Sequence, residues 1–296
     1  MDMPAIFGAM PLGLRRHSLV KFLLTVFPDS HDQLIEFNSS ARAYVDLRDP
    51  EARNVFLKRS FEAEFFRIAE SVLASGGVYF DCGANFGLCT FGLLEAVDHG
   101  NLQCHLFEAN PRLIAYLERS KKLYPFVQIN VVEGCLSDHR GHTRFQIDAQ
   151  NLGRSHVHPE GSSLSRNVVL DDYLEEEKIE MINFLKLDIE GQELNALQGL
   201  SSALNRQIVE VIYLEIATDV LDRYHLVPGD VVGFLVSNGF RIFYCREKDI
   251  SGDCSTTVRF KRDKLNQLRL TEFKLPEGNL RTDLLAVHEA LIATNS

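Results

Sequence analysis

The sequence lacks most of the short motifs that identify common enzyme classes. It has no Gly-Lys pair, which excludes a phosphate-binding P-loop, and neither His-Glu-x-x-His nor Gly-x-Ser-x-Gly occurs. Its 6 cysteines show no Cys-x-x-Cys spacing, so we interpret them as reduced thiols of a cytoplasmic protein. Zinc is not expected either, because the paired histidines at 139 and 142 and at 156 and 158 have no companion ligands at zinc spacing.

Basic clusters and long hydrophobic runs are also missing. The formal net charge is −10, and no group of Lys and Arg stands out that would neutralise nucleic-acid phosphates or anionic lipids. The apolar stretch from Leu19 to Leu24 is interrupted by Lys21 and is too short to span a bilayer. We therefore expect neither a nucleic-acid partner nor membrane insertion, and we interpret this stretch as a helix that caps a globular core.

The most informative stretch that is present reads Val-Tyr-Phe-Asp-Cys-Gly-Ala-Asn-Phe-Gly, residues 78–87. A short apolar run ends in Asp81, a turn with Gly83 and Gly87 follows, and an apolar helical pattern comes next. Such an arrangement is typical of sites for nucleoside-containing cofactors. Glycine lets the ligand approach the backbone closely, and the N-terminus of the following helix favours an anionic group.

The spacing within this turn argues against a dinucleotide. The Gly-x-Gly-x-x-Gly fingerprint would need glycine at positions 83, 85 and 88, where the chain has Gly83, Asn85 and Leu88. Asn85 has a side chain where a pyrophosphate needs bare backbone. The carboxylate of an amino acid is smaller, would tolerate Asn85 and would accept a hydrogen bond from it. A nicotinamide-dependent oxidoreductase therefore remains only the alternative reading.

Glu108 ends the second apolar strand, Cys104–Glu108. A carboxylate in this place accepts hydrogen bonds from both ribose hydroxyls of an adenosine. The competing interpretation is that Glu108 only supports the next helix, for which Asn110 is a good N-cap and Pro111 a good first residue. Adenosine combined with an amino-acid carboxylate describes S-adenosylmethionine, which we expect to be the cofactor.

Together these motifs resemble the FkbM family of S-adenosylmethionine-dependent methyltransferases, a branch of the class I enzymes. The matching segments occur in the family's order over roughly residues 60–290, and they are Asp81–Gly87, Phe107–Pro111, Glu133–Asp138, Leu170–Tyr173 and Leu185–Glu193. The departures are small: Cys82 and Leu187 replace residues that are often β-branched in the family, and Ala109 replaces a frequent proline.

Hydrophobic periodicity predicts an α/β fold of the doubly wound type, with a mostly parallel, seven-stranded, Rossmann-like sheet covered by helices on both faces. The strands are expected at 78–81, 104–108, 127–133, 182–187, 211–215, 240–244 and 283–287, with an added strand at 143–147. The resemblance implies that the last strand is antiparallel. Residues 1–60 are expected to form an N-terminal cap of a helix and a hairpin, and residues 61–296 the S-adenosylmethionine-binding methyltransferase domain.

Four acids, Asp81, Glu108, Asp188 and Glu215, fall at the carboxyl ends of expected strands. Ligands of open parallel sheets bind at this edge. We expect the cofactor to be held by Asp81, Gly83, Asn85, Gly87, Glu108, Leu136 and Ser137. For Leu136 and Ser137, which follow the third strand and would frame the adenine ring, the expectation rests more on the resemblance than on spacing.

Methyl transfer is an in-line displacement at a sulfonium carbon, so the protein must align the acceptor oxygen and provide a base for its proton. The resemblance places Asp188 opposite the transferable methyl, which makes it the first candidate base and Glu190 the second. His156 and His158 are outside choices. A Mg²⁺ ion held by Asp188 and Glu215 is a less favoured version of the site.

Lys186 lies on the same strand face as Asp188 and needs an acidic partner, because an unpaired buried ammonium costs several kcal/mol. Asp188 or Glu193 can supply this partner, and Asp81 is a third possibility. The alternative for Glu193 is a carboxylate that only favours the first turn of a helix.

The acceptor pocket is the least determined part of the sequence. Asp148–Asn167 is the longest irregular stretch, and segments of this kind are often lids or binding loops. The resemblance implies an acceptor hydroxyl on a small molecule, a sugar, a polyketide or a glycoconjugate. N-methylation and a non-catalytic cofactor-binding module stay open as alternatives, and the oligomeric state is not indicated.

Overall fold

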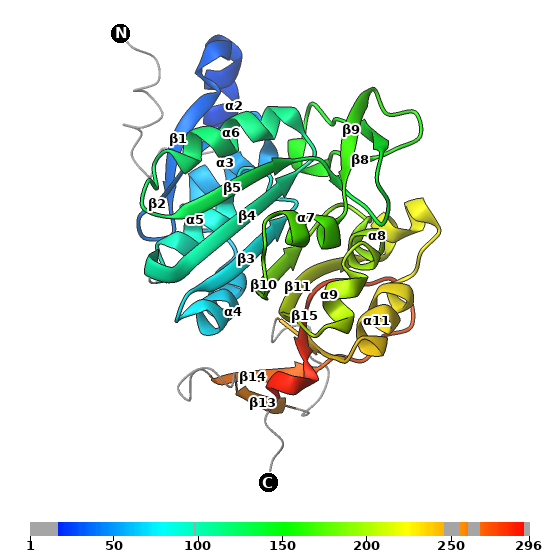
Figure 1. Cartoon of the computed structure of the whole chain (residues 1–296). Helices are drawn as coiled ribbons and strands as arrows, with labels where there is room; N and C mark the ends of the chain where they lie inside the picture. The colour runs from blue at the N-terminus through cyan, green and yellow to red at the C-terminus, as the bar shows by residue number, and fades with distance from the viewer. Residues whose placement is uncertain (1–16, 98, 246–254, 260–266, 293–296) are drawn as a thin grey trace.

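The computed structural model describes residues 17–97, 99–245, 255–259 and 267–292 (Figure 1). Its centre is a nine-stranded sheet in the order β13-β14-β12-β15-β11-β10-β3-β4-β5. The bounds are β3 Gly77–Cys82, β4 Leu102–Glu108, β5 Gln128–Glu133, β10 Ile182–Leu187, β11 Val209–Ala217, β12 Phe240–Tyr244, β13 Ser255–Arg259, β14 Gln267–Glu272 and β15 Arg281–His288.

The predicted α/β architecture is confirmed. Strands β5, β4, β3, β10 and β11 run parallel, and β15 is antiparallel to both β11 and β12, as expected. The sheet is larger than the seven strands predicted, because β13 and β14 extend it beyond β12. Neither of these two strands was anticipated from hydrophobic alternation.

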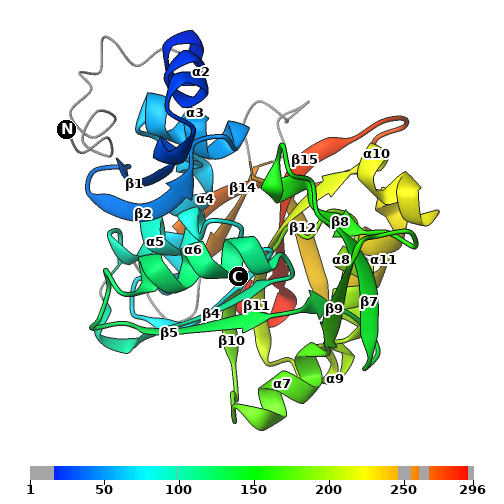
Figure 2. The ribbon, with the colours of Figure 1, turned by 90° about the horizontal axis from the view of Figure 1, so that it is seen from above.

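Helices cover both faces of the sheet, so the doubly wound arrangement is also confirmed (Figure 2). One face carries α4 Ala63–Leu73, α5 Leu88–Leu94 and α6 Pro111–Lys121, and the other carries α7 Leu170–Glu176, α8 Glu193–Gln198, α9 Ser201–Asn205 and α11 Pro228–Ser237. Successive strand residues belong to the hydrophobic cores on opposite faces of the sheet. Tyr79 packs with the first set of helices, and its neighbour Phe80 packs with the second.

The segment before the sheet contains α2 His17–Val26, the expected antiparallel hairpin of β1 Asp32–Phe37 and β2 Ala41–Asp46, and helix α3 Pro50–Lys58. The hairpin lies on α6, where the Tyr44 amide donates to the Ser120 hydroxyl at 2.8 Å. Its apolar side chains belong to the same core cluster as those of α5. The division of the chain at residue 60 remains a prediction.

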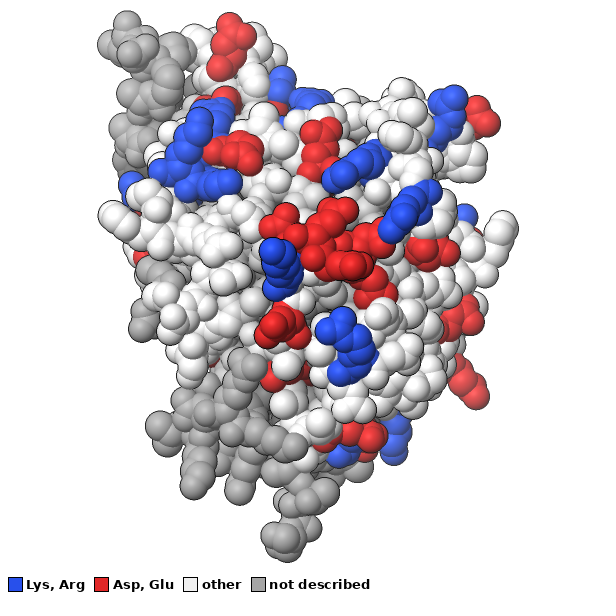
Figure 3. Space-filling view, in the orientation of Figure 1, with Lys and Arg blue, Asp and Glu red and all other residues white. Residues whose placement is uncertain are grey.

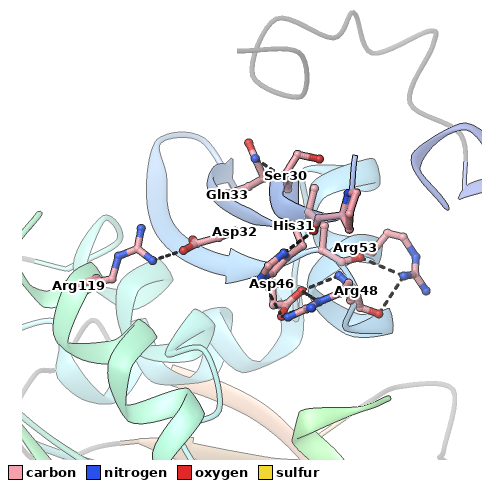
Figure 4. Close-up of polar contacts among 10 residues, drawn as sticks. Ser30, His31, Asp32, Gln33, Asp46, Arg48, Arg53 and Arg119 are labelled. Atoms are coloured by element: carbon pink, nitrogen blue, oxygen red, sulfur yellow. Dashed lines mark hydrogen bonds and ion pairs between the residues drawn. The ribbon is translucent and has the colours of Figure 1, made fainter. Parts of the chain in front are cut away.

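Polar contacts fix α3 against this hairpin (Figure 4). The Asp46 carboxylate pairs with the Arg48 guanidinium at 2.5 Å. Arg53 of α3 donates to the carbonyl oxygens of Leu47 and Arg48, both at 3.0 Å. The start of α3, which faces the strand ends described below, is therefore held at a defined place.

A second, four-stranded sheet follows β5 in the order β6-β9-β7-β8. Its strands are β6 Cys135–Leu136, β7 His142–Gln146, β8 His156–Val157 and β9 Ser163–Val168. β7 is the added strand expected near 143–147. The expectation of an irregular stretch over Asp148–Asn167 is wrong in its second half. There β9 buries the polar residues Ser165 and Asn167, while the apolar Leu164 stays 67% exposed. The strand therefore lacks the alternation of buried apolar and exposed polar residues by which strands are predicted.

Two local predictions concern membrane spans and thiols. No helix in the described part of the chain combines the length and hydrophobicity needed to cross a bilayer. The cysteines of the described residues are all buried free thiols, at positions 82, 89, 104, 135 and 245. Their burial fits the expected place of Cys82, Cys104 and Cys135 beside core strands.

Candidate active site

The glycine turn after β3 has the backbone shape that the sequence required. Gly83, Asn85 and Gly87 have positive φ angles of 81°, 52° and 75°. A Cβ atom on Gly83 would collide with the carbonyl oxygen of Asp188, which follows β10. Glycine at this position thus allows two neighbouring strand ends to close together beneath the turn.

Glu108 at the end of β4 holds this turn. Its carboxylate accepts hydrogen bonds from the backbone amides of Asn85 and Asn110, each at 2.8 Å. The side chain of Asn110 in turn caps α6 by accepting from the Arg112 amide at 3.1 Å. Burial raises the pKa of Glu108, and the backbone donors act against that rise. Glu108 therefore supports the turn and the start of α6, and the same side chain also lines a cavity.

Lys186 connects β10 to β3. Its ammonium lies 3.3 Å from the Asp81 carboxylate, 3.5 Å from that of Asp188 and 3.1 Å from the Gly83 carbonyl oxygen. Burial by itself lowers the pKa of Lys186, but the two carboxylates outweigh it and raise that pKa well above its ordinary value. Of the acidic partners considered for Lys186, both Asp188 and Asp81 form ion pairs with it.

The remaining proposed partner of Lys186, Glu193, serves another purpose. It is 4% exposed and accepts hydrogen bonds from the backbone amides of Ile189 and Gly191, at 3.2 Å and 3.1 Å. Burial raises its pKa to about 7. Glu193 is thus a structural acid that shapes the turn after β10.

A cavity of about 250 Å³ lies over the carboxyl ends of β3, β4, β10 and β11. Of the predicted site residues, it is lined by Gly83, Asn85, Glu108, Leu136, Asp188 and Glu190. Asp81, Gly87 and Ser137 are absent from its lining. Asp81 is fully buried behind the turn, where it also accepts a hydrogen bond from the Thr90 hydroxyl at 2.7 Å.

A second cavity of about 190 Å³ adjoins the first on the side of α4. The residues common to both linings are Glu51, Gly83, Asn85, Asp188 and Glu215. Lys186, Glu62 and Tyr213 are among those that line only the second. The Glu215 carboxylate pairs with Arg281 at 3.1 Å. Burial and the nearby Asp188 carboxylate raise the pKa of Glu215 to about 7.

Glu51 is the site residue that our reading of the sequence missed. It lies in the first turn of α3, and its carboxylate accepts a hydrogen bond from Asn85 Nδ2 at 2.9 Å. The protein groups around the carboxylate and the nearby Asp188 carboxylate raise the pKa of Glu51 to about 7, although the residue as a whole is exposed. The sequence Asp49-Pro50-Glu51 is typical of a helix start, because it combines an N-cap, a first-turn proline and an acid. Nothing in the local sequence indicates that this helix start faces Asn85.

The stretch 148–157 closes over the first cavity. The Leu152 amide donates to Asp49 at 2.9 Å, and the Tyr224 hydroxyl donates to the Val157 carbonyl oxygen at 2.9 Å. Leu152, Gly153, Arg154 and Ser155 line the cavity, whereas His156 and His158 do not. The position of these residues is compatible with the lid or binding loop expected from the sequence.

Of the two candidate bases, Asp188 lines both cavities and Glu190 lines the first. Glu190 pairs with Arg223 at 3.6 Å. Within the described residues, no group of three or more His, Cys, Asp or Glu side chains is arranged to hold a metal ion. The magnesium site considered at Asp188 and Glu215 has only two protein ligands and stays a prediction.

These features define an α/β protein with a cavity at the carboxyl edge of its sheet. The family model for the methyltransferase FkbM domain matches residues 81–242, more than half of the chain. The chain belongs to the FkbM methyltransferase family, as its motifs led us to expect. No curated protein matches the sequence.

Solved structures that resemble this one are also methyltransferases by name. An FkbM methyltransferase from Methylobacillus flagellatus KT is 16% identical, with a TM-score of 0.43 over 80% of this chain and 52% of that chain. This chain therefore spans about half the length of that protein. Precorrin-6y C5,15-methyltransferase from Geobacter metallireducens GS-15 is 13% identical, with a TM-score of 0.40 over 77% and 89% of the two chains.

Proposed function

We propose that this protein transfers the methyl group of S-adenosylmethionine to a hydroxyl oxygen of a small-molecule or glycoconjugate acceptor. The observation that carries the proposal is the cavity at the carboxyl ends of adjacent parallel strands, in which Glu108 is tied to the glycine turn through Asn85. Cofactors of doubly wound folds bind at this edge. A cytoplasmic location belongs to the same proposal.

The lining of the first cavity suits each part of the cofactor. Glu108 is placed to accept the ribose hydroxyls, since a carboxylate has lone pairs beyond those used by its two backbone donors. Leu136 and Phe107 provide apolar surface beside it for an adenine ring. The amino-acid end then extends past Gly83 and Asn85 toward Asp188.

Asp188 is the base in this proposal. The bound cofactor would supply the methyl group, and the Asp188 carboxylate would accept the proton of the acceptor hydroxyl. Lys186, 3.5 Å away, holds that carboxylate in place. Residues 151–155 and 157 line one side of the cavity, where they would limit the access of water to an aligned acceptor.

The charge of the site favours an uncharged or cationic acceptor over a phosphorylated one. Glu51, Asp188 and Glu215 line both cavities, so a polyanion would approach several carboxylates at once. The face in Figure 3 also gathers acidic side chains at its centre, over α7, which contains Asp171, Asp172, Glu175 and Glu176. Both observations agree with the expectation that nucleic acid is not the substrate.

A nicotinamide dinucleotide fits this site less well. Its diphosphate would lie against the turn at Asn85. There the Glu51 carboxylate is 2.9 Å from the side-chain nitrogen of Asn85, Nδ2. Two negative groups in contact at this point would repel each other. The arrangement therefore supports the methyltransferase over the oxidoreductase alternative.

Thermal unfolding with added ligands tests the proposal. S-adenosylhomocysteine at 100 times its dissociation constant should stabilise the protein by about 2.7 kcal/mol, which raises Tm by about 5–10 °C. NAD at the same concentration should leave Tm unchanged, and the reverse pattern would refute the proposal. A screen of hydroxylated metabolites for the mass gain of one methylene then identifies the acceptor.

A further inference from the structure

The junction of the two cavities contains an uneven set of carboxylates. Asp188 has Lys186 as a cationic partner, and Glu215 has Arg281. Glu51 differs, because among the described residues no Lys, Arg or His nitrogen lies within 4.0 Å of its carboxylate. Its one hydrogen-bond partner there is the neutral amide of Asn85. One negative group at the junction is thus left without a positive partner of its own.

The Asn85 amide strengthens this imbalance. Asn85 Nδ2 already donates to Glu51, and the buried Oδ1 atom of the same side chain has no hydrogen-bond donor. Most of the unmatched polar capacity of the pair is therefore acceptor capacity, namely the remaining lone pairs of the Glu51 carboxylate and Asn85 Oδ1, against the one second N–H of Asn85 Nδ2. A carboxylate would find this environment unfavourable, whereas an ammonium group has three donors and no acceptor. The sequence-based expectation that Asn85 serves a cofactor carboxylate meets a competing partner, Glu51, already in place.

Glu51 also lies where the amino-acid end of the cofactor must go. The backbone amide of Asn85 is bonded to Glu108, and its side chain is bonded to Glu51. Asn85 therefore separates the ribose-binding acid from Glu51. A ligand whose ribose is on Glu108 and whose chain follows the turn arrives beside Glu51, and Gly83 between them leaves the path open.

The position of Glu51 is fixed by contacts of its helix, α3. Asp49 caps α3 by accepting from the amides of Glu51 and Ala52 at 2.9 Å and 3.1 Å. The other oxygen of Asp49 accepts from Leu152 in the stretch that covers the first cavity. Arg53 anchors the same helix to the two residues that follow the hairpin, Leu47 and Arg48. Glu51 is thus presented to the junction on a capped and anchored helix.

We propose that Glu51 binds the ammonium group of the cofactor's amino-acid end. This inference rests on the proposed function and deepens it. It assigns a cofactor-binding residue to the N-terminal segment, which lies outside the matched family domain at residues 81–242. The α3 helix then completes a site whose remaining parts come from the sheet.

Calorimetric titration of matched ligands into two variants tests this assignment. Glu51→Gln removes the charge, yet its amide oxygen can still accept from Asn85. We expect this variant to bind S-adenosylhomocysteine about 10-fold to 100-fold more weakly than the wild type, the range for a charge-assisted hydrogen bond. 5′-Methylthioadenosine, which lacks the amino-acid end, should bind both proteins within about twofold. The control variant Glu64→Gln removes a surface carboxylate of α4 that pairs with Arg67, and it should bind both ligands as the wild type does.

A third ligand isolates the ammonium from the carboxylate. The deaminated analogue of S-adenosylhomocysteine should bind the wild type weakly, and Glu51→Gln should weaken it no further. Two results would overturn the assignment: unchanged binding of S-adenosylhomocysteine to Glu51→Gln, or an equal loss for 5′-methylthioadenosine, which would mean that the turn itself is disturbed. If the wild type binds none of the three ligands, the proposed function itself fails.

Discussion

The two ends of the candidate site carry their negative charge in different ways. At the end of β4, Glu108 is satisfied by two backbone amides that belong to the local turn and helix start. At the ends of β10 and β11, Asp188 and Glu215 depend on side-chain cations, Lys186 and Arg281. The donors to Glu108 are backbone amides, which a side-chain substitution cannot remove, although Asn85 lies 23 positions away in the chain. Asp188 and Glu215 instead use side-chain cations, one from the same strand end and one 66 positions away, so single substitutions should affect this end more.

Substitution of Asp188 by Asn should give the largest effect, at the end that depends on side chains. The loss of a general base lowers turnover by about 10²–10⁴-fold, while the affinity for S-adenosylhomocysteine should change little. Initial rates on the acceptor found by the metabolite screen measure this. Glu190→Gln is the matched control, because Glu190 is paired with Arg223 and lines one cavity only. If Glu190→Gln has the larger effect, the order of the two candidate bases is reversed.

Replacing Lys186 by Met tests whether the charges at this end stabilise the fold as well as the site. Asp81 is fully buried, so without Lys186 its carboxylate would lack a cation inside the protein. Removing one partner of a buried ion pair costs about 3–5 kcal/mol. Urea unfolding of the variant should show this loss in the free energy of unfolding. The double variant with Asp81→Asn should recover part of it, and a loss below about 1 kcal/mol would contradict this account.

The comparison also explains what could be predicted from the sequence. The parallel core strands, the antiparallel last strand and the glycine turn follow from apolar runs, glycines and caps that are adjacent in the chain. Strands β13 and β14 lie at the far edge of the sheet, and β9 buries Ser165 and Asn167. β13 and β9 have no clear apolar signal, whereas β14 alternates with Leu268 and Leu270 buried, a signal that our reading of the sequence missed.

The same reasoning applies to the site. Asn85, Glu108 and Asp188 stand beside strand ends, and the rule that ligands bind at that edge was enough to select them. Glu51 could not be selected in this way, because its contact with Asn85 spans 34 positions and depends on how α3 lies against the hairpin. The partner of Lys186 was ambiguous because its choice depends on the register of β10 with β3, which places Lys186 beside Asp81.

The buried acid Glu193 should make the stability of the ligand-free protein depend on pH. Burial raises the pKa of Glu193 from 4.5 to about 7, so between these values the folded state keeps a proton that the unfolded chain releases. The free energy of unfolding should therefore fall as pH rises from about 4.5 to about 7, by about 2–3 kcal/mol for this group. Urea unfolding at pH 5.5 and 8 measures the fall, and Glu193→Gln should make it smaller. A wild type and a variant with the same pH dependence would show that Glu193 ionises at its ordinary pKa.

The smallest effect is expected at the end built by the backbone. Glu108→Gln keeps the shape of the side chain but weakens its hydrogen bonds to the Asn85 amide and to a ribose, because bonds to a charged acceptor contribute about 1.5–3 kcal/mol. The affinity for S-adenosylhomocysteine should fall about 10-fold to 100-fold, and 5′-methylthioadenosine, which has the same ribose, should lose as much. This equal loss is the opposite of the selective loss expected for Glu51→Gln. If Glu108→Gln weakened only the ligand that has an amino-acid end, Glu108 would not hold the ribose, and the direction in which the cofactor lies across Asn85 would have to be reversed.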